Sequence, residues 1–314
     1  MAKEDNSTND KKSIEAKDGA MNLAVTPESA FEKLRETTDV LLMLYPKTKT
    51  GNFHENIDSS DELELYKRIT EKKDFKKSLL ILLDTGGGNV YAAVKIMDTL
   101  RTKYGRIVIA VPQEAKSSGT MMCCGANALI MTSISELGPL DKPMIHPSDE
   151  SAYISALDIV KSIDDMLEKA LDDQIDYAFK LKKQAGISTQ KAFELSFDAV
   201  SRLISPMLCR EDVKIYNQAK RLLEIANTYA SELLDKHMFN YLKKDSLRER
   251  VIKMVVHRLI WLYPDHGFAI RREELREWFF EVENAEEIAY WPVLWKYFID
   301  NVGSSSKVKV IEFV

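Results

Sequence analysis

Two short turns in this chain hold residues from which an acyl-transfer site can be built. The first, called here the glycine turn, is the run of three glycines at 86–88; the second, the serine turn, is Lys-Ser-Ser-Gly-Thr at 116–120. Glycines let backbone N–H groups face a ligand, which suits an oxyanion hole. Ser117 lies on a predicted strand-to-helix turn, where a serine Oγ is raised and exposed as it is in a nucleophile elbow. The N–H of Ser118 is placed to complete the oxyanion hole.

Each turn also has a simpler interpretation. Glycines close tight turns, and serines at helix starts cap the backbone. The glycine turn lacks GxGxxG spacing and no GK[ST] follows it, so a nucleotide-phosphate site is poorly supported. Cys123 and Cys124 follow on the same predicted helix. Either could be a thiol nucleophile, but we expect both to be buried and to pack the helix against the core. Only the two turns together favour acyl transfer.

Strands and helices must bring the two turns together. The apolar run 78–83 precedes the glycine turn, and a helical pattern over 90–103 follows it. A strand at 106–111 precedes the serine turn, and a helical pattern follows over 119–126. Alternating strands and helices with short connections predict a parallel sheet with right-handed crossovers. The carboxyl ends of such strands share one edge, where α/β proteins place their chemistry.

The other elements follow from capping signals and apolar periodicity. Strands are predicted at 40–44, 128–131, 135–137 and 308–313, and helices at 27–36, 61–70, 155–183, 189–200, 246–262, 272–282 and 285–302. An apolar stripe at 209–235, with spacings of three and four residues, packs on the core or forms a subunit contact. The C-terminal half is therefore predicted to be mostly helical.

Composition limits the classes of function. The 314 residues carry a net charge of −5 and no long basic run, so nucleic acid is not an expected partner. Three cysteines cannot make a disulfide framework, five histidines lack metal-ligand spacing, and no cofactor is expected. No apolar run reaches the ~20 residues of a membrane helix, and the N-terminus lacks a secretory signal. We therefore expect a soluble cytoplasmic protein without a transmembrane segment.

Three segments, in order and with suitable spacing, resemble motifs of a known family. They are Asp-Thr-Gly-Gly-Gly at 84–88, the serine turn, and Ser-Glu-Leu-Gly-Pro-Leu-Asp at 135–141. They look like the T-P-G-G, K-S-A-G-T and S-x-E-L-G-P-I-D segments of the serine dehydrogenase proteinase family, which has the Clp/crotonase fold. The resemblance covers about 57–275 and is strongest in 78–145. Gly86 replaces the proline of the family's turn, which leaves this turn more flexible.

The resemblance implies an α/β Clp/crotonase-like core of repeated β-β-α units with a parallel sheet, and assembly into homo-oligomers. It also implies Ser117 as the nucleophile and oxyanion donors from Gly87, Gly88 and Ser118. We divide the chain into a disordered N-terminal segment (1–25), the core (26–205) and a mostly helical C-terminal extension (206–314).

The general base is less clearly indicated. Relatives with this fold use a histidine followed by an aspartate, or a lysine, and the candidates here are Lys142, His146 and His266. A lysine must be desolvated for its pKa to fall far enough. Lys116 adjoins the nucleophile, but we expect its side chain to point elsewhere.

Three functions fit these observations. The first is a serine peptidase that hydrolyses peptide bonds through an acyl-enzyme on Ser117, with a peptide or protein as substrate. The second is a crotonase-like acyl-CoA enzyme, for which Glu114 and Glu136 are available as acid/base groups. The third is a catalytically silent, oligomeric scaffold with the Clp fold.

Overall fold

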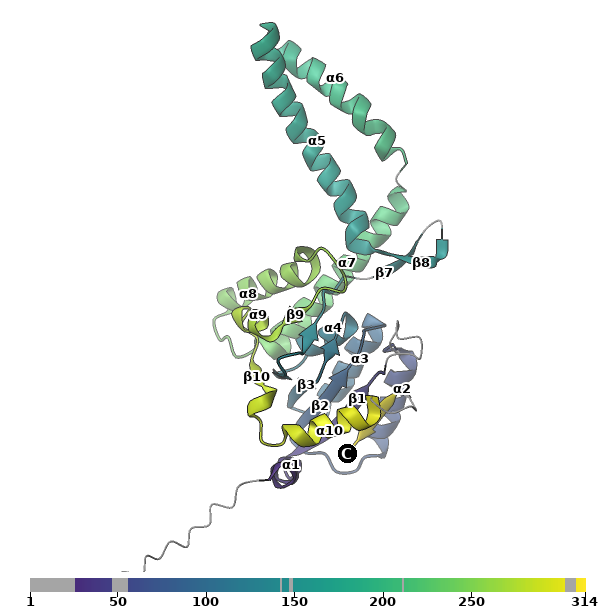
Figure 1. The fold of residues 1–314 in the computed structure, drawn as a ribbon, viewed down its shortest axis with the longest axis vertical. Helices are drawn as coiled ribbons and strands as arrows, with labels where there is room; N and C mark the ends of the chain where they lie inside the picture. Colours follow the sequence, from purple (N-terminus) through teal and green to yellow (C-terminus); the bar gives the residue numbers. More distant parts are fainter. Residues whose placement is uncertain (1–25, 47–55, 142, 147–148, 211, 303–308) are drawn as a thin grey trace, which may run out of the picture.

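The computed structural model describes residues 26–46, 56–141, 143–146, 149–210, 212–302 and 309–314, so the segment 1–25 lies outside the described residues. Its centre is a six-stranded sheet (Figure 1). In sheet order the strands are β10 (Val282–Asn284), β5 (Ala128–Met131), β3 (Arg106–Val111), β2 (Ser78–Asp84), β1 (Thr38–Leu44) and β11 (Val310–Phe313). All neighbours pair in parallel except β1 and β11. The predicted α/β class with a mostly parallel sheet is confirmed.

A short second layer of strands follows the main sheet. It consists of β4 (Glu114–Ala115), β6 (Glu136–Leu137) and β9 (Ile270–Arg271). The chain passes from β3 through β4 into a helix. After β2 the order is similar, because Thr85 forms an isolated parallel bridge with Ala115 of β4 before the next helix begins. The order strand, short strand, helix is the expected β-β-α unit, and it turns the chain sharply at the carboxyl edge of the sheet.

Local signals set the helix boundaries. The helices are α1 (Pro27–Arg35), α2 (Ser59–Glu71), α3 (Val90–Arg101), α4 (Ser118–Cys124), α5 (Ala156–Ala185), α6 (Thr189–Leu208), α7 (Val213–Leu233), α8 (Asp245–His257), α9 (Arg272–Glu277) and α10 (Trp291–Val302). Thr26 caps α1, and Ser155 caps α5 by accepting from the N–H of Asp158. Gly186 ends α5 in the left-handed conformation. Five-residue π-helical segments extend α7 and α8, to Met238 and Leu262.

Helices cover both faces of the sheet, so its central strands are buried on both sides. In β1, Leu41 and Met43 join the core cluster that also contains Leu223 of α7 and Val255 of α8. The alternate residues face the opposite cluster, which contains Trp291 of α10. This explains why the central strands are continuous apolar runs rather than alternating ones.

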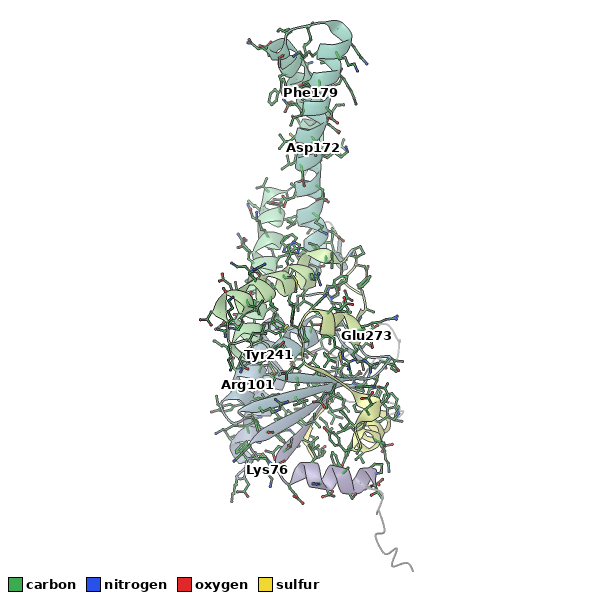
Figure 2. The ribbon with its side chains drawn as sticks, turned by 90° about the vertical axis from the view of Figure 1, so that its left-hand side faces the viewer. Lys76, Arg101, Asp172, Phe179, Tyr241 and Glu273 are labelled. Carbon is green, nitrogen blue, oxygen red and sulfur yellow. The ribbon has the colours of Figure 1, made fainter. Side chains whose placement is uncertain are left out.

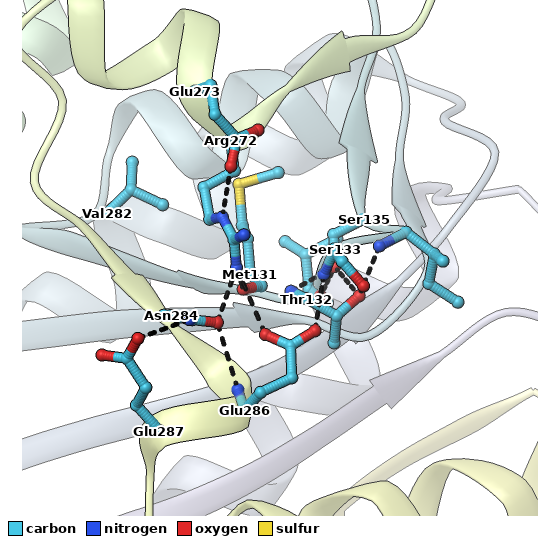
Figure 3. Close-up of polar contacts among 12 residues, drawn as sticks. Met131, Thr132, Ser133, Ser135, Arg272, Glu273, Val282, Asn284, Glu286 and Glu287 are labelled. Atoms are coloured by element: carbon cyan, nitrogen blue, oxygen red, sulfur yellow. Dashed lines mark hydrogen bonds and ion pairs between the residues drawn. The ribbon is translucent and has the colours of Figure 1, made fainter.

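The structure corrects the helix predicted at 272–282. Helix α9 ends at Glu277, Phe279 takes a positive φ of 69°, and β10 begins at Val282 as an edge strand of the main sheet. Tertiary contacts override the helical pattern. As Figure 3 shows, the Arg272 guanidinium binds the Met131 carbonyl at 3.2 Å, together with Asn284 and Glu286. These bonds hold α9 and β10 against the end of β5.

Residues from 206 onward supply both edge strands of the sheet, β10 and β11, and the helix α10 that covers one face. The division of the chain into a core (26–205) and a C-terminal extension (206–314) remains a prediction. The strand predicted at 308–313 is confirmed over Val310–Phe313 as β11, and residue 308 lies outside the described residues. Helix α10 begins later than predicted, after a short 3₁₀ turn at Ala285–Glu287.

Helices α5 and α6 form a long antiparallel pair that projects from the body of the protein (Figures 1 and 2). At its base lies a β-hairpin of β7 (Pro143–His146) and β8 (Asp149–Ser155), which the sequence pattern did not predict. Within the described part of the chain, no helix combines the length and the apolar character needed to cross a bilayer.

Candidate active site

The glycine turn and the serine turn meet at the carboxyl edge of the sheet. Strands β2 and β3 are parallel neighbours, and beyond them Lys116 donates its N–H to the Thr85 carbonyl at 3.0 Å. A Cβ built on Gly87 would lie 2.9 Å from Cβ and 3.6 Å from Oγ of Ser117. No side chain larger than hydrogen fits there without moving Ser117. The two predicted turns are therefore in direct contact.

Ser117 has a strained backbone and an uncommitted hydroxyl. Its φ of 48° and ψ of −110° lie outside the favoured regions for an L-residue, and only Phe279 shares a positive φ among the described non-glycine residues. Ser117 is half-buried, makes no capping bond to α4, and its Oγ bonds to no described residue. The neighbouring Ser118 Oγ is buried without a partner. The capping interpretation of these two serines therefore does not hold in this structure.

The glycine turn contributes one unused N–H group beside Ser117. Gly88 has a φ of 139°, and a Cβ on it would lie 2.3 Å from the Ile57 carbonyl oxygen. Ile57 donates to the Gly87 carbonyl and accepts from the Asn89 N–H, which fixes the turn on both sides. Gly87, which the resemblance implied as an oxyanion donor, instead donates its N–H to Thr85 Oγ1 at 3.1 Å. The Gly88 N–H, in contrast, bonds to no described residue.

The N–H of Ser118 is equally uncommitted, because the first residue of a helix has no acceptor one turn earlier. Gly88, Ser117 and Ser118 line one small cavity. Most of the remaining wall is apolar and comes from α3, α4, α7 and the 139–141 segment: Val90, Met121, Leu140, Leu222, Ile225 and Ala226. The residues that carry the uncommitted hydroxyl and the two unused N–H groups therefore line one mostly apolar pocket.

Lys116 holds the site together and does not reach into it. Its Nζ lies 2.6 Å from Glu136 Oε1 and donates to the carbonyls of Leu137, Gly267 and Phe268. The expectation that this side chain points away from Ser117 is confirmed. The contact also commits Glu136 to an ion pair. A Cβ on Gly138 would lie 2.7 Å from Lys116 Cδ, so glycine there makes room for the lysine.

We expect Lys116→Met to destabilise the fold by about 3 kcal/mol, because the change leaves Glu136 and three carbonyls without their cation. Urea unfolding followed by circular dichroism measures the effect. Lys95→Met is the matched control, since Lys95 is exposed, its partner Glu62 is only half-buried, and the ion pair should contribute less than about 1 kcal/mol. Equal losses in the two variants would contradict the structural role assigned to Lys116.

The structure describes the three candidate bases to different extents. Lys142 lies outside the described residues, but Asp141, which precedes it, is 2% exposed and lines the Ser117 cavity. Asp141 Oδ1 accepts from the Leu157 N–H at 3.1 Å, which ties this segment to the start of α5. His146 ends β7 with its backbone opposite Asp149, and its side chain is outside the description.

His266 lies in the turn whose neighbouring carbonyls bind Lys116. Its Nδ1 is buried without a hydrogen-bond partner. It lines a second cavity of about 270 Å³, and Asp141 is the residue common to this cavity and the Ser117 cavity. Among the described residues, none accepts a hydrogen bond from Ser117 Oγ. The geometry thus brings together Ser117 and the unused N–H groups of Gly88 and Ser118, and leaves the base to be proposed.

The cysteines of α4 are not nucleophiles in this structure. Cys123 and Cys124 are fully buried, and burial raises the pKa of both thiols, that of Cys124 to about 12. A thiol with so high a pKa is almost entirely protonated near neutral pH and therefore inert. The expected packing role is confirmed. Within the described ranges, no group of three histidine, cysteine or carboxylate side chains is arranged to hold a metal ion.

Comparisons with known proteins give limited likeness. No family model matches the chain. An uncharacterized protein of Methanocaldococcus jannaschii is 25% identical over 175 residues, which are 52% of this chain and 60% of that protein. The match therefore spans less than two thirds of the relative.

Two solved structures of a membrane-bound stomatin-specific protease are also similar. The serine-to-alanine variant is 20% identical, with 44% of this chain and 64% of that chain covered and a TM-score of 0.29. The lysine-to-alanine variant, in complex with a substrate peptide, is 22% identical, with 44% and 60% covered and a TM-score of 0.28.

Proposed function

We propose that this protein is a serine peptidase that hydrolyses peptide bonds through an acyl-enzyme on Ser117. One observation carries the proposal: a strained serine with an uncommitted hydroxyl shares a cavity with two unused N–H groups, from Gly88 and Ser118. Strained backbone persists where the surrounding structure imposes it, and it is concentrated at functional sites. The motif resemblance over 84–141 supports the same reaction.

In this reaction Ser117 Oγ attacks the carbonyl carbon of the scissile peptide while a base takes the hydroxyl proton. The carbonyl oxygen becomes an oxyanion and accepts hydrogen bonds from the Gly88 and Ser118 N–H groups. The base then gives its proton to the leaving amine as the C–N bond breaks. A water molecule hydrolyses the resulting ester, which releases the acid and restores the serine. The apolar cavity beside Ser117 is suited to a small apolar side chain of the substrate.

We favour Lys142 as the base, with His146 and His266 as the other candidates. The residue before Lys142, Asp141, lines the nucleophile's cavity and is anchored through Leu157. A lysine must be desolvated for its pKa to fall far enough to accept a proton near neutral pH, and most of the wall of the Ser117 cavity is apolar. His266 fits less directly, because it lines the neighbouring cavity instead.

An acyl-CoA enzyme is the weaker candidate. Such chemistry needs a free carboxylate to move a proton beside the oxyanion hole. Glu136, one of the two glutamates available for it, is paired with Lys116 at 2.6 Å. The proposed peptidase mechanism does not use the Glu136 carboxylate.

Labelling of the purified full chain with a fluorophosphonate, followed by peptide mass mapping, tests the proposal. We expect one modified residue, Ser117, and competition by peptides that carry a small apolar residue at the cleavage site. Ser246→Ala, on the exposed surface of α8, is the control variant and should label as the natural protein does. Absence of labelling in a folded sample would reject an activated Ser117, and labelling blocked by acyl-CoA but not by peptides would favour the acyl-CoA enzyme.

A further inference from the structure

The pair of helices α5 and α6, called here the arm, exposes far more apolar surface than a solvated element requires. Leu171 and Phe197 are each 63% exposed, and Leu203 is 73% exposed. Leu167, Ile175, Phe179 and Met207 are also exposed. Large apolar patches on a soluble protein are usually interaction sites. We therefore expect another molecule to cover this apolar surface.

The two helices of the arm pack closely only near its tip. There the rings of Phe179 and Phe193 meet edge to face at 6.1 Å, and Ala178 and Ala192 are buried. Towards the body the helices diverge (Figure 1) and leave a mostly apolar groove of about 350 Å³ between them. Leu171 and Phe197 lie on opposite walls of this groove. The open groove is wide enough to receive apolar side chains from another helix.

Charge is distributed unevenly along the arm. The middle of α5 is acidic, with Asp164, Asp165, Glu168, Asp172, Asp173 and Asp176 against a single lysine, Lys169. The tip is basic, with Lys180, Lys182 and Lys183 at the end of α5 and Lys191 at the start of α6. Figure 2 shows Asp172 in the middle of the arm and Phe179 nearer its tip. Because the charges at its middle and its tip are opposite, the arm is complementary to a second copy of itself that runs in the opposite direction.

We propose that two copies of this chain pair through their arms in antiparallel orientation, so that the basic tip of each lies over the acidic middle of the other. A two-fold axis near Ile175 brings Glu168 of one copy opposite Lys182 of its partner, and the reverse. A two-fold contact uses the same patch on both copies, which the self-complementary charge pattern satisfies. The exposed Leu171 and Phe197 of each arm are then covered by the partner. This inference is independent of the proposed peptidase activity.

Two cysteines test the orientation directly. In one helix, residues 168 and 182 are about 21 Å apart, because each residue adds 1.5 Å. Cysteines at these two positions cannot form a disulfide within one chain, because the Cα atoms of two bridged cysteines must lie within about 7 Å of each other. In a Cys209→Ser background, which removes the exposed native thiol, the double variant Glu168→Cys/Lys182→Cys should therefore form covalent dimers on mild oxidation. The single variants should not, and cross-linking of either one with itself would indicate a parallel arrangement and overturn the proposal.

Sedimentation equilibrium at low salt tests the charge contribution. Lys182→Glu/Lys183→Glu should weaken dimerisation by about 10-fold or more, and Glu168→Lys/Asp172→Lys should do the same. Mixing the two variants should restore association, because opposite charges then face each other across the hetero-pair. Leu171→Asp/Phe197→Asp should give a folded monomer, with circular dichroism as the check on folding. A monomeric natural protein at 100 μM, or charge reversals without effect, would overturn the proposal.

Discussion

Replacing Ser117 with alanine should lower kcat/KM for peptide hydrolysis by about 10⁴-fold or more, because loss of a nucleophile leaves only the contribution of the oxyanion hole and binding. Labelling by fluorophosphonate should disappear. The fold should remain, since Ser117 Oγ makes no hydrogen bond to a described residue that the change would break. Steady-state kinetics with a cleaved peptide, beside a urea unfolding curve, measure both effects. An alanine variant with more than a tenth of the natural activity would remove Ser117 from the mechanism.

A second variant at the same position separates activity from strain. Ser117→Gly should be as inactive as the alanine variant but more stable than it by about 1 kcal/mol. The positive φ of 48° costs an L-residue about 1–3 kcal/mol, and this exceeds the 0.5–1 kcal/mol of chain entropy that glycine loses on folding. Equal stability of the two variants would show that the backbone at this turn is not strained.

Replacing Gly88 with alanine should destabilise the fold by about 4 kcal/mol or more, the second largest effect we expect. A Cβ there would lie 2.3 Å from the Ile57 carbonyl oxygen and 2.6 Å from its nitrogen, both backbone atoms that cannot rotate away. The φ of 139° adds a further cost for any L-residue. Because relief of the clash moves the Gly88 N–H, any folded fraction should also lose about 10²- to 10³-fold in kcat.

Gly105→Ala is the matched control for this variant. A Cβ on Gly105 would have nothing within 4 Å, so its stability should change by less than about 1 kcal/mol. Chemical unfolding of both variants under the same conditions gives the comparison. If Gly88→Ala were as stable and active as Gly105→Ala, the glycine turn would be neither tightly packed nor part of an oxyanion hole.

Much of the fold was predictable because its signals are local. Strand β3 and strand β5 begin and end at the predicted residues, and helix α5 begins at its serine cap and ends at Gly186. The contact of Gly87 with Ser117 was also predictable, since parallel strands bring their carboxyl ends to one edge. These features depend on periodicity, capping and turn chemistry, which a short window of sequence contains.

The parts that were missed depend on distant residues. Val282 leaves the helical pattern for β10 because it pairs with the edge of β5 and its carbonyl accepts hydrogen bonds from Arg276. The wall of the Ser117 cavity formed by Leu222 and Ile225 comes from α7, more than a hundred residues downstream, and the stripe in that helix indicated burial without saying what it covers. No local pattern specifies a partner so far away in the chain.

The two edge strands have a consequence for biosynthesis. Strand β10 covers β5, and β11 covers β1, yet both are made long after the strands they protect. About 150 residues separate β5 from β10, which takes a ribosome roughly 8 to 30 s at common rates of elongation. During that time a nascent chain carries four apolar parallel strands with both edges open, which is a surface for pairing with neighbouring chains. Protection of these open edges by a chaperone should therefore raise the yield of folded protein.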